Sequence, residues 1–173
     1  MKKIILILGL LMIAMLIYNN KEEYILIPNE AIRVRVIANS DNIDDIDIKE
    51  KVKDDLSKEL IKLLENVNTI NEVRKIINNN LDFINRIVDK SLKMFNYDKS
   101  YTINYGLNYF PEKEFKEVKY DSGYYESLVI TLGEGKGPNY WCVLYPPLCN
   151  LNEVENKEIE YKILIKELID KYL

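Results

Sequence analysis

The sequence predicts an α+β fold in which two amphipathic helices pack on a mostly antiparallel sheet of four to five strands, with a further helix at the C-terminus. Three observations predict it. Apolar and polar residues alternate over 31–39, apolar residues then recur at steps of three and four between 44 and 95, and alternation returns in short runs between 101 and 145. Two helices over one face of such a sheet form a natural two-layer domain. We assign this single domain to residues 26–150.

The first 20 residues have the pattern of an export signal. Lys2 and Lys3 precede the uncharged apolar run 4–18, and charged residues resume at Lys21. The positive start and the length of the run are typical of a secretory signal. The run is short for a transmembrane helix, which needs about 20 apolar residues. No clear cleavage site follows, so a cleaved signal peptide and an uncleaved N-terminal anchor over 1–20 both remain open. We expect an exported protein that contacts a membrane only through this segment, if the segment is retained.

Composition excludes several classes of function. The chain has no histidine, 24 basic residues, 28 acidic residues and a net charge of −4. The lack of histidine removes Ser-His-Asp and Cys-His catalysis and histidine metal sites, and two cysteines alone do not form an ordinary structural zinc site. The acidic balance argues against nucleic acid as a partner, because phosphate contacts need clustered lysine and arginine. We expect no metal, no cofactor and no small-molecule ligand.

The first half of the domain reads as one strand followed by two helices. Apolar side chains alternate with Arg33 and Arg35 in the strand 31–39, and polar turn residues follow it. The apolar stripe predicts a first helix from about 44 to 65. Thr69 and Glu72 then have the spacing of a capping box, which predicts the start of a second helix that runs to position 95. The asparagine triplet at 78–80 weakens the middle of that helix.

The second half is predominantly β-type. We expect strands, in chain order, at 101–110, 115–120, 126–132 and 140–145, followed by a helix at 153–173. Gly106 predicts a break or bulge in the first of these strands. We treat residues 151–173 as a C-terminal helical extension of the domain.

Residues 133–149 are the densest stretch of unusual chemistry in the chain. They hold both cysteines, the only tryptophan, three of the six glycines and three of the five prolines. The glycines at 133, 135 and 137 follow a strand, as phosphate-binding loops do. However, no Ser or Thr follows Lys136 as a Walker loop requires, and no helix opens after the glycines. The glycines are better explained by positive φ angles or close backbone contacts.

Cys142 and Cys149 flank the pair Pro146 and Pro147, which turn the chain back on itself. In an exported protein a disulfide is the default state of such a pair. It would stabilise the fold by roughly 2–3 kcal/mol in the chain-entropy description. The alternative is a pair of buried free thiols.

Two groups of side chains in this region are candidate contact residues. Trp141, with Tyr140 and Tyr145, belongs either to the core or to a contact surface, since rigid exposed aromatic residues are favoured binding anchors. Arg33 and Arg35 share the outer face of the first strand. They are either a solvated strand face or a guanidinium pair for a carboxylate-bearing partner.

Five stretches of the sequence, taken together, resemble stage II sporulation protein R of endospore-forming bacteria. The matching stretches lie, in order, at 27–41, 49–56, 110–111, 123–128 and 133–149. The sequence departs modestly from the family pattern. Pro138 stands where the family often has histidine, Tyr140 replaces the first of a tryptophan pair, and Tyr145 replaces phenylalanine.

The resemblance implies a signalling protein and not an enzyme. Family members are exported across the forespore membrane into the intermembrane space, where they activate a membrane-bound aspartic protease of the mother cell that processes pro-sigma-E. We expect no catalytic residue. We expect the partner-binding residues to be Arg33, Arg35, Asn39, Ser40, Asp41, Gly133, Gly135, Gly137, Asn139, Tyr140, Trp141, Tyr145, Pro146 and Pro147.

Two other functions remain open on the sequence. The first is a secreted cell-wall hydrolase that uses paired carboxylates such as Glu126 and Glu134, which would need to lie roughly 5–9 Å apart across a cleft. The second is a passive envelope-binding module. Purified protein mixed with the protease in membranes would separate this module from the signalling protein.

Overall fold

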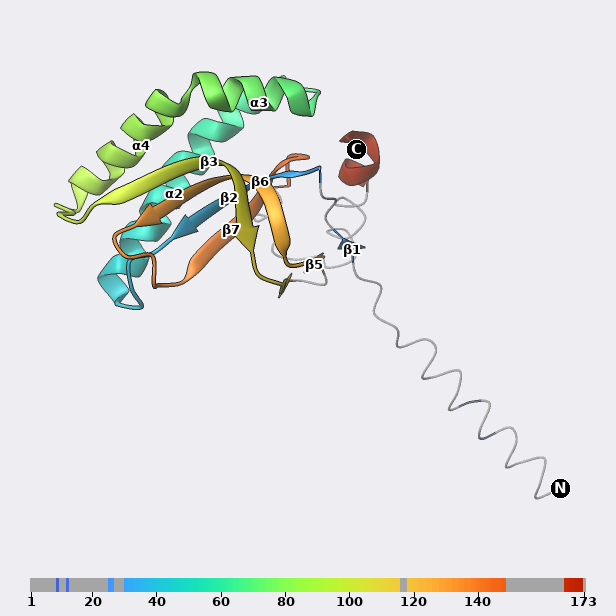
Figure 1. The fold of residues 1–173 in the computed structure, drawn as a ribbon, viewed down its shortest axis with the longest axis horizontal. Coiled ribbons are helices and arrows are strands. Elements are labelled where there is room, and N and C mark those ends of the chain that lie inside the picture. Colours follow the sequence, from blue (N-terminus) through green and yellow to red (C-terminus); the bar gives the residue numbers. More distant parts are fainter. Residues whose placement is uncertain are drawn as a thin grey trace.

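The computed structural model describes residues 9, 12, 25–26, 30–115, 118–148 and 167–172. Its elements are β1 (Ile25–Leu26), β2 (Ile32–Ile37), α2 (Ile43–Leu64), α3 (Ile70–Asn79), α4 (Leu81–Met94), β3 (Tyr101–Phe110), β4 (Lys113–Phe115), β5 (Val118–Tyr120), β6 (Gly123–Leu132) and β7 (Asn139–Tyr145). Residues 167–172 are also helical. Figure 1 shows α2, α3 and α4 on one side of the strands.

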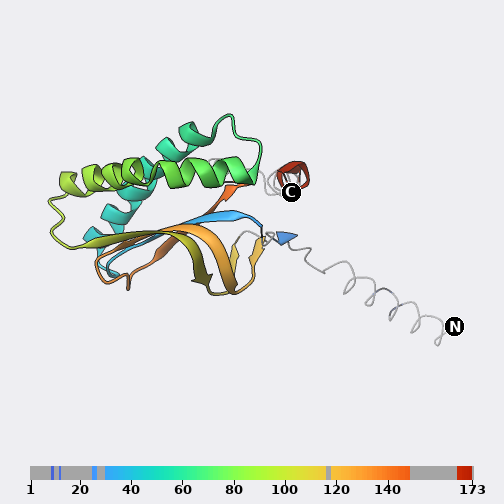
Figure 2. The same cartoon turned by 45° about the horizontal axis from the view of Figure 1, so that its top comes forward.

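The main sheet has four strands in the order β3-β6-β2-β7. The outer pairs are antiparallel, whereas the central pair, β2 with β6, is parallel. A second small sheet has the order β1-β5-β4. Figure 2 shows the helices as one layer and the main sheet as the other. The expected α+β class and the mostly antiparallel main sheet are therefore confirmed.

The helical layer contains one more helix than expected. The helix α2 begins one residue before the predicted start, and the capping box at Thr69 is present: its hydroxyl accepts from the Glu72 amide at 3.3 Å and the Glu72 carboxylate accepts from the Thr69 amide at 3.2 Å. The prediction of a single second helix was wrong, because the chain divides at Asn80 into α3 and α4. The Asn80 side chain donates to the Ile76 carbonyl at 2.8 Å, so it competes with the backbone donors that would continue the helix.

The strands also differ in detail from the prediction. The expected break at Gly106 is wrong, since β3 pairs with β6 in one register over its whole length. The predicted strand 115–120 is instead the hairpin of β4 and β5. The strand β6 begins three residues earlier than expected, at Gly123.

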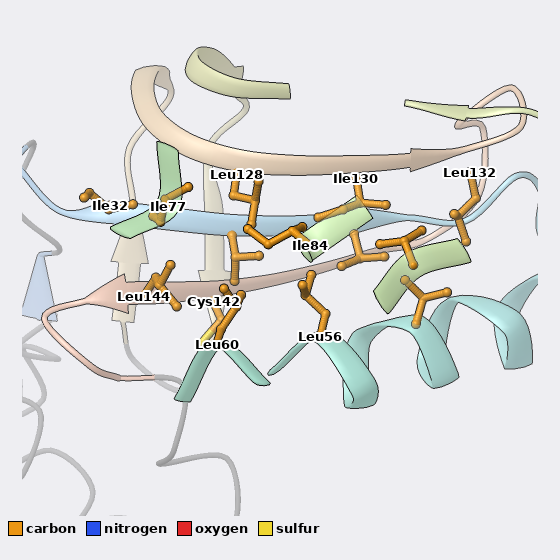
Figure 3. Packing of buried hydrophobic residues seen from close by; sticks show 14 of the residues in the cluster. Ile32, Leu56, Leu60, Ile77, Ile84, Leu128, Ile130, Leu132, Cys142 and Leu144 are labelled. Atoms are coloured by element: carbon orange, nitrogen blue, oxygen red, sulfur yellow. The ribbon is translucent and has the colours of Figure 1, made fainter. Parts of the chain in front are cut away.

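The core lies between the helices and the main sheet. Side chains from β2, β6 and β7 that point to the helices pack against the apolar stripes of α2, α3 and α4 (Figure 3). The labelled members are Ile32, Leu56, Leu60, Ile77, Ile84, Leu128, Ile130, Leu132, Cys142 and Leu144. Because side chains alternate along a strand, the intervening residues of β2, β6 and β7 point to the opposite face, which carries the candidate site.

The two ends of the chain are described only in part. The predicted signal or anchor at 1–20 lies outside the described residues apart from positions 9 and 12. Among the residues that the structure describes, no helix has the length and apolar character needed to span a bilayer. Of the predicted helical extension 151–173, only 167–172 is described. Its Leu168 and Ile169 pack against the buried cluster Ala31, Val143 and Leu148.

Candidate partner-binding site

The candidate residues after β2 and after β6 meet at one end of the main sheet, in a unit that we call the loop end (39–45 with 133–138). Asp45 is 4% exposed. Its carboxylate accepts hydrogen bonds from the Asn39 side-chain amide and the Ser40 hydroxyl, both at 2.6 Å, and from the Lys99 ammonium at 3.1 Å. The bonds from Asn39 and Ser40 lower the pKa of Asp45, Lys99 adds to this effect and burial opposes it. The carboxylate therefore holds the loop after β2 in place.

The three glycines of the loop end are required by close packing. Gly133 has φ +54°, and a side chain on it would overlap the Asn39 side chain. Gly135 has φ +64° and lies against Thr131. A Cβ on Gly137 would overlap the carbonyl of Ser40. The expectation of positive φ angles or close contacts is confirmed, since two glycines meet the first condition and all three have close neighbours.

Arg33 lies on the face opposite the helices and is not a solvated strand residue. Its side chain is 1% exposed, so Arg33 has the expected outer position on the strand, but the alternative of a solvated strand face is wrong for this residue. The guanidinium carbon lies 3.4 Å from the centroid of the Tyr125 ring and 5.7 Å from those of Phe110 and Tyr120. Burial lowers the pKa of Arg33, with partial compensation from Tyr125. The sequence did not reveal this burial because the three rings come from distant parts of the chain.

Arg35 and Trp141 lie beside Arg33 and are partly exposed. The Arg35 Nε donates to the Asn139 side-chain oxygen at 3.0 Å, and burial lowers its pKa. The Lys113 ammonium lies 4.8 Å from the centroid of the Trp141 ring, and the Phe110 ring packs edge-on against Trp141 at 5.1 Å between centroids. Of the predicted partner residues, Arg33, Arg35, Asn139 and Trp141 therefore share one face.

The remaining aromatic and proline candidates lie elsewhere. Tyr140 points to the helix side, with the Lys53 ammonium 5.4 Å from its ring centroid. Tyr145 is 4% exposed, and its hydroxyl lies 3.1 Å from the carbonyls of both Asn68 and Tyr172. Tyr145 therefore belongs to the core, which is one of the two alternatives that the sequence left open. Pro146, in a cis peptide bond, is buried, and Pro147 is partly exposed.

The disulfide stays a prediction. Cys142 is 7% exposed and belongs to the core between the helices and the sheet. Cys149 lies outside the described residues.

The two carboxylates considered for hydrolysis do not form a pair. Glu126 lies in β6 and Glu134 beyond its end. The six steps along the strand from Glu126 to Leu132 alone span about 20 Å at the usual rise of a strand. The Glu126 carboxylate accepts from the Arg74 Nε at 2.9 Å and the Tyr105 hydroxyl at 2.6 Å. Burial acts to raise its pKa, but these bonds hold it below the usual value, which is unfavourable for a general acid.

Sequence reasoning missed several residues of the site. Asp45 organises the loop end, Phe110 and Tyr125 lie against the two arginines, and Lys113 lies over the Trp141 ring. The position of Asp45 at the start of a predicted helix was the only available signal for these contacts. Among the described residues, no group of three or more acidic, cysteine or histidine side chains is placed to hold a metal ion.

Comparison with known proteins agrees with the resemblance seen in the sequence. The family model for stage II sporulation protein R matches residues 28–155. Stage II sporulation protein R of Bacillus subtilis (strain 168) is 34% identical to the chain over 159 residues, which cover 87% of this chain and 71% of that protein. No solved structure is detectably similar. The match includes the loop end and both arginines, and we conclude that the chain belongs to the stage II sporulation protein R family.

Proposed function

We propose that this protein is an exported signal that activates a membrane-bound aspartic protease of the mother cell, which then processes pro-sigma-E. Membership of the stage II sporulation protein R family gives the chain a role in sporulation and is the observation that carries the proposal. In this proposal the protein acts by contact and not by catalysis. The separation of Glu126 from Glu134 supports that view, because it removes the carboxylate pair that the sequence offered to a hydrolase.

The loop end is our first candidate for the contact surface. Its backbone is fixed by the bonds of Asp45 and by the close packing of its glycines. A loop that is ordered before binding loses little conformational entropy in the complex, so more of its contact energy appears as affinity. Asp41, Glu134 and Lys136 are exposed on this unit, and the Lys136 ammonium forms an ion pair with the Glu134 carboxylate at 2.6 Å.

The test is a co-expression assay that scores processing of pro-sigma-E with and without this chain, in cells that contain the protease. Processing that depends on the chain supports the signal. No processing with a folded, exported chain contradicts it and leaves the passive envelope-binding module.

The contact surface is tested with a double charge reversal on the loop end, Asp41→Lys with Lys136→Glu. Both residues are exposed, so the melting temperature should change little. Lys75→Glu with Asp82→Lys is the matched control, because it has the same net charge change on exposed positions of α3 and α4. Lost processing in the first variant alone supports the surface. Normal processing in both variants would remove the loop end from it.

A further inference from the structure

The guanidinium of Arg33 carries N–H donors that find no acceptor among the described residues. Its Nε, Nη1 and Nη2 atoms are buried and form no hydrogen bond with any described residue. Stacking on Tyr125 occupies the flat face of the group and leaves the N–H bonds at its edge unused. These bonds lie in the plane of the guanidinium, so an acceptor must approach along that plane and not from the side of the ring.

Such an arrangement is poorly suited to stabilising the fold. An arginine cannot lose its charge in a protein, and a buried charge without hydrogen bonds is unfavourable. Replacing a buried charged group with an apolar side chain of similar size is often neutral or stabilising. The charge on Arg33 is therefore better explained by a ligand than by the core.

The neighbours of Arg33 add positive charge and one more free donor. Arg35 and Lys113 lie around the Trp141 ring. The pKa of Lys113 is lowered by burial first and then by the like charges of Arg35 and Lys49, whereas the carboxylate of Asp121 acts to raise the pKa of Arg33. The indole Nε1 of Trp141 is also buried, and it has no hydrogen-bond acceptor within the part of the chain that the structure describes.

The donor set favours a planar oxyanion. The fork of N–H bonds on a guanidinium matches the two oxygens of a carboxylate, and the indole N–H supplies a further donor. The aromatic rings of Phe110, Tyr125 and Trp141 lie against the two guanidinium groups, and such rings suit the apolar stem of an acidic side chain better than a free inorganic ion.

We propose that Arg33, with Arg35, Lys113 and the Trp141 indole, forms a binding site for a carboxylate of a partner peptide. The carboxylate enters on the side of Arg35, Lys113 and Trp141, which are partly exposed, whereas Phe110 and Tyr125 are buried. The partner's role as a receptor rests on the proposed function. The binding site itself does not, and its test contains no protease.

The emission of Trp141 reports on this site alone, because the chain has no other tryptophan. Full-length protein in mild detergent is titrated with the peptide acetyl-Glu-Phe-Glu-amide, with acetyl-Gln-Phe-Gln-amide as the uncharged control. We expect a saturable change in emission with the acidic peptide and binding at least about ten-fold weaker with the control. Equal binding of both peptides, or no response to either, overturns the site. Inorganic phosphate that binds as tightly as the acidic peptide overturns the assignment to a peptide carboxylate.

Substitutions at position 33 separate binding from stability. We expect Arg33→Met to abolish binding while the melting temperature stays equal or rises, and Arg33→Lys to weaken binding by about ten-fold, because lysine lacks the fork of donors. Arg86→Met, at an arginine that lies over Phe83 on α4, is the matched control and should bind normally. Normal binding by Arg33→Met overturns the inference.

If Arg33→Met does not fold, Lys113→Gln provides the second test. This variant should bind the acidic peptide more weakly than the wild type does, with no change in its binding of the control peptide. Unchanged binding of the acidic peptide by this variant counts against the site. If the wild-type protein does not bind the acidic peptide but supports normal processing of pro-sigma-E in the co-expression assay, this inference is overturned and the proposed function stays intact.

Discussion

Gly137 packs directly against the backbone carbonyl of Ser40, and a Cβ at position 137 would overlap the carbonyl oxygen. The backbone on either side of this contact is paired. The Gly137 amide donates to the Ala38 carbonyl and the Lys136 amide donates to the Asn39 carbonyl, each at 3.0 Å. The loop after β2 and the loop before β7 therefore form one rigid unit.

We expect Gly137→Ala to lower the free energy of unfolding by roughly 1–3 kcal/mol, because the added methyl group must displace backbone and not a flexible side chain. Urea denaturation measures the change. Lys136→Ala, at the exposed neighbouring position, is the control and should stay within about 0.5 kcal/mol of the wild type. Equal stability of both variants would mean that the loop moves apart at no energetic cost.

The carboxylate of Asp45 should make the stability of the protein depend on pH. Its pKa in the folded state is lowered by hydrogen bonds from Asn39 and Ser40. Its contribution to stability is therefore present above the unfolded pKa of about 3.9 and is lost as the pH falls through the lower folded pKa. We expect Asp45→Asn to lower the free energy of unfolding at pH 7 by about 1–3 kcal/mol.

The same variant should lose less stability than the wild type between pH 5 and pH 2. Melting temperatures of both proteins across this range isolate Asp45 from the other carboxylates, which the two proteins share. If the melting temperatures of the two proteins differ by the same amount at every pH, Asp45 has the same pKa in the folded and unfolded states.

Cys142 and Cys149 are expected to form a disulfide in the exported protein. Mass spectrometry of protein isolated without reductant should show the loss of two hydrogens. Reduction should then lower the free energy of unfolding by roughly 2–3 kcal/mol in the chain-entropy description. Two thiols that alkylate readily in folded, exported protein would contradict the prediction.

Signalling should not need a catalytic carboxylate. Cells with the double variant Glu126→Gln and Glu134→Gln should show almost normal processing of pro-sigma-E by the protease. It should lose about 1 kcal/mol of stability, because Glu126 accepts bonds from Arg74 and Tyr105. Glu134→Gln alone should have almost no effect on stability, since Glu134 is exposed. If the double variant folds stably but supports no processing of pro-sigma-E, the cell-wall hydrolase becomes the favoured function again.

Local signals in the sequence predicted the elements well. The alternation around Arg33 and Arg35 located β2, and the spacing of Thr69 and Glu72 located the start of α3. The asparagine triplet marked the place where the second helix divides, although its pattern did not say whether the helix bends, breaks or continues. Apolar periodicity and capping act within a few residues, so one chain suffices to reveal them.

Contacts between distant segments were not predictable in the same way. The parallel pairing of β2 with β6 depends on the whole sheet and not on either strand. The burial of Arg33 depends on Phe110 and Tyr125, and the helices α2, α3 and α4 lie between Arg33 and these two residues in the sequence. An alternating arginine has the same pattern whether its face is solvated or covered by aromatic rings.

The central position of β2 has a consequence for how the chain folds. It is the first strand of the main sheet to be synthesised, yet Val34 pairs with Leu128 on one side and with Cys142 on the other. The sheet cannot close until nearly the whole domain is available, whereas the helices can form from local contacts much earlier. Folding that depends on such distant pairing is slow compared with that of helical proteins. A chain that is synthesised from its N-terminus therefore keeps β2 unpaired until β6 and β7 are available, so assembly of the sheet belongs to the end of synthesis.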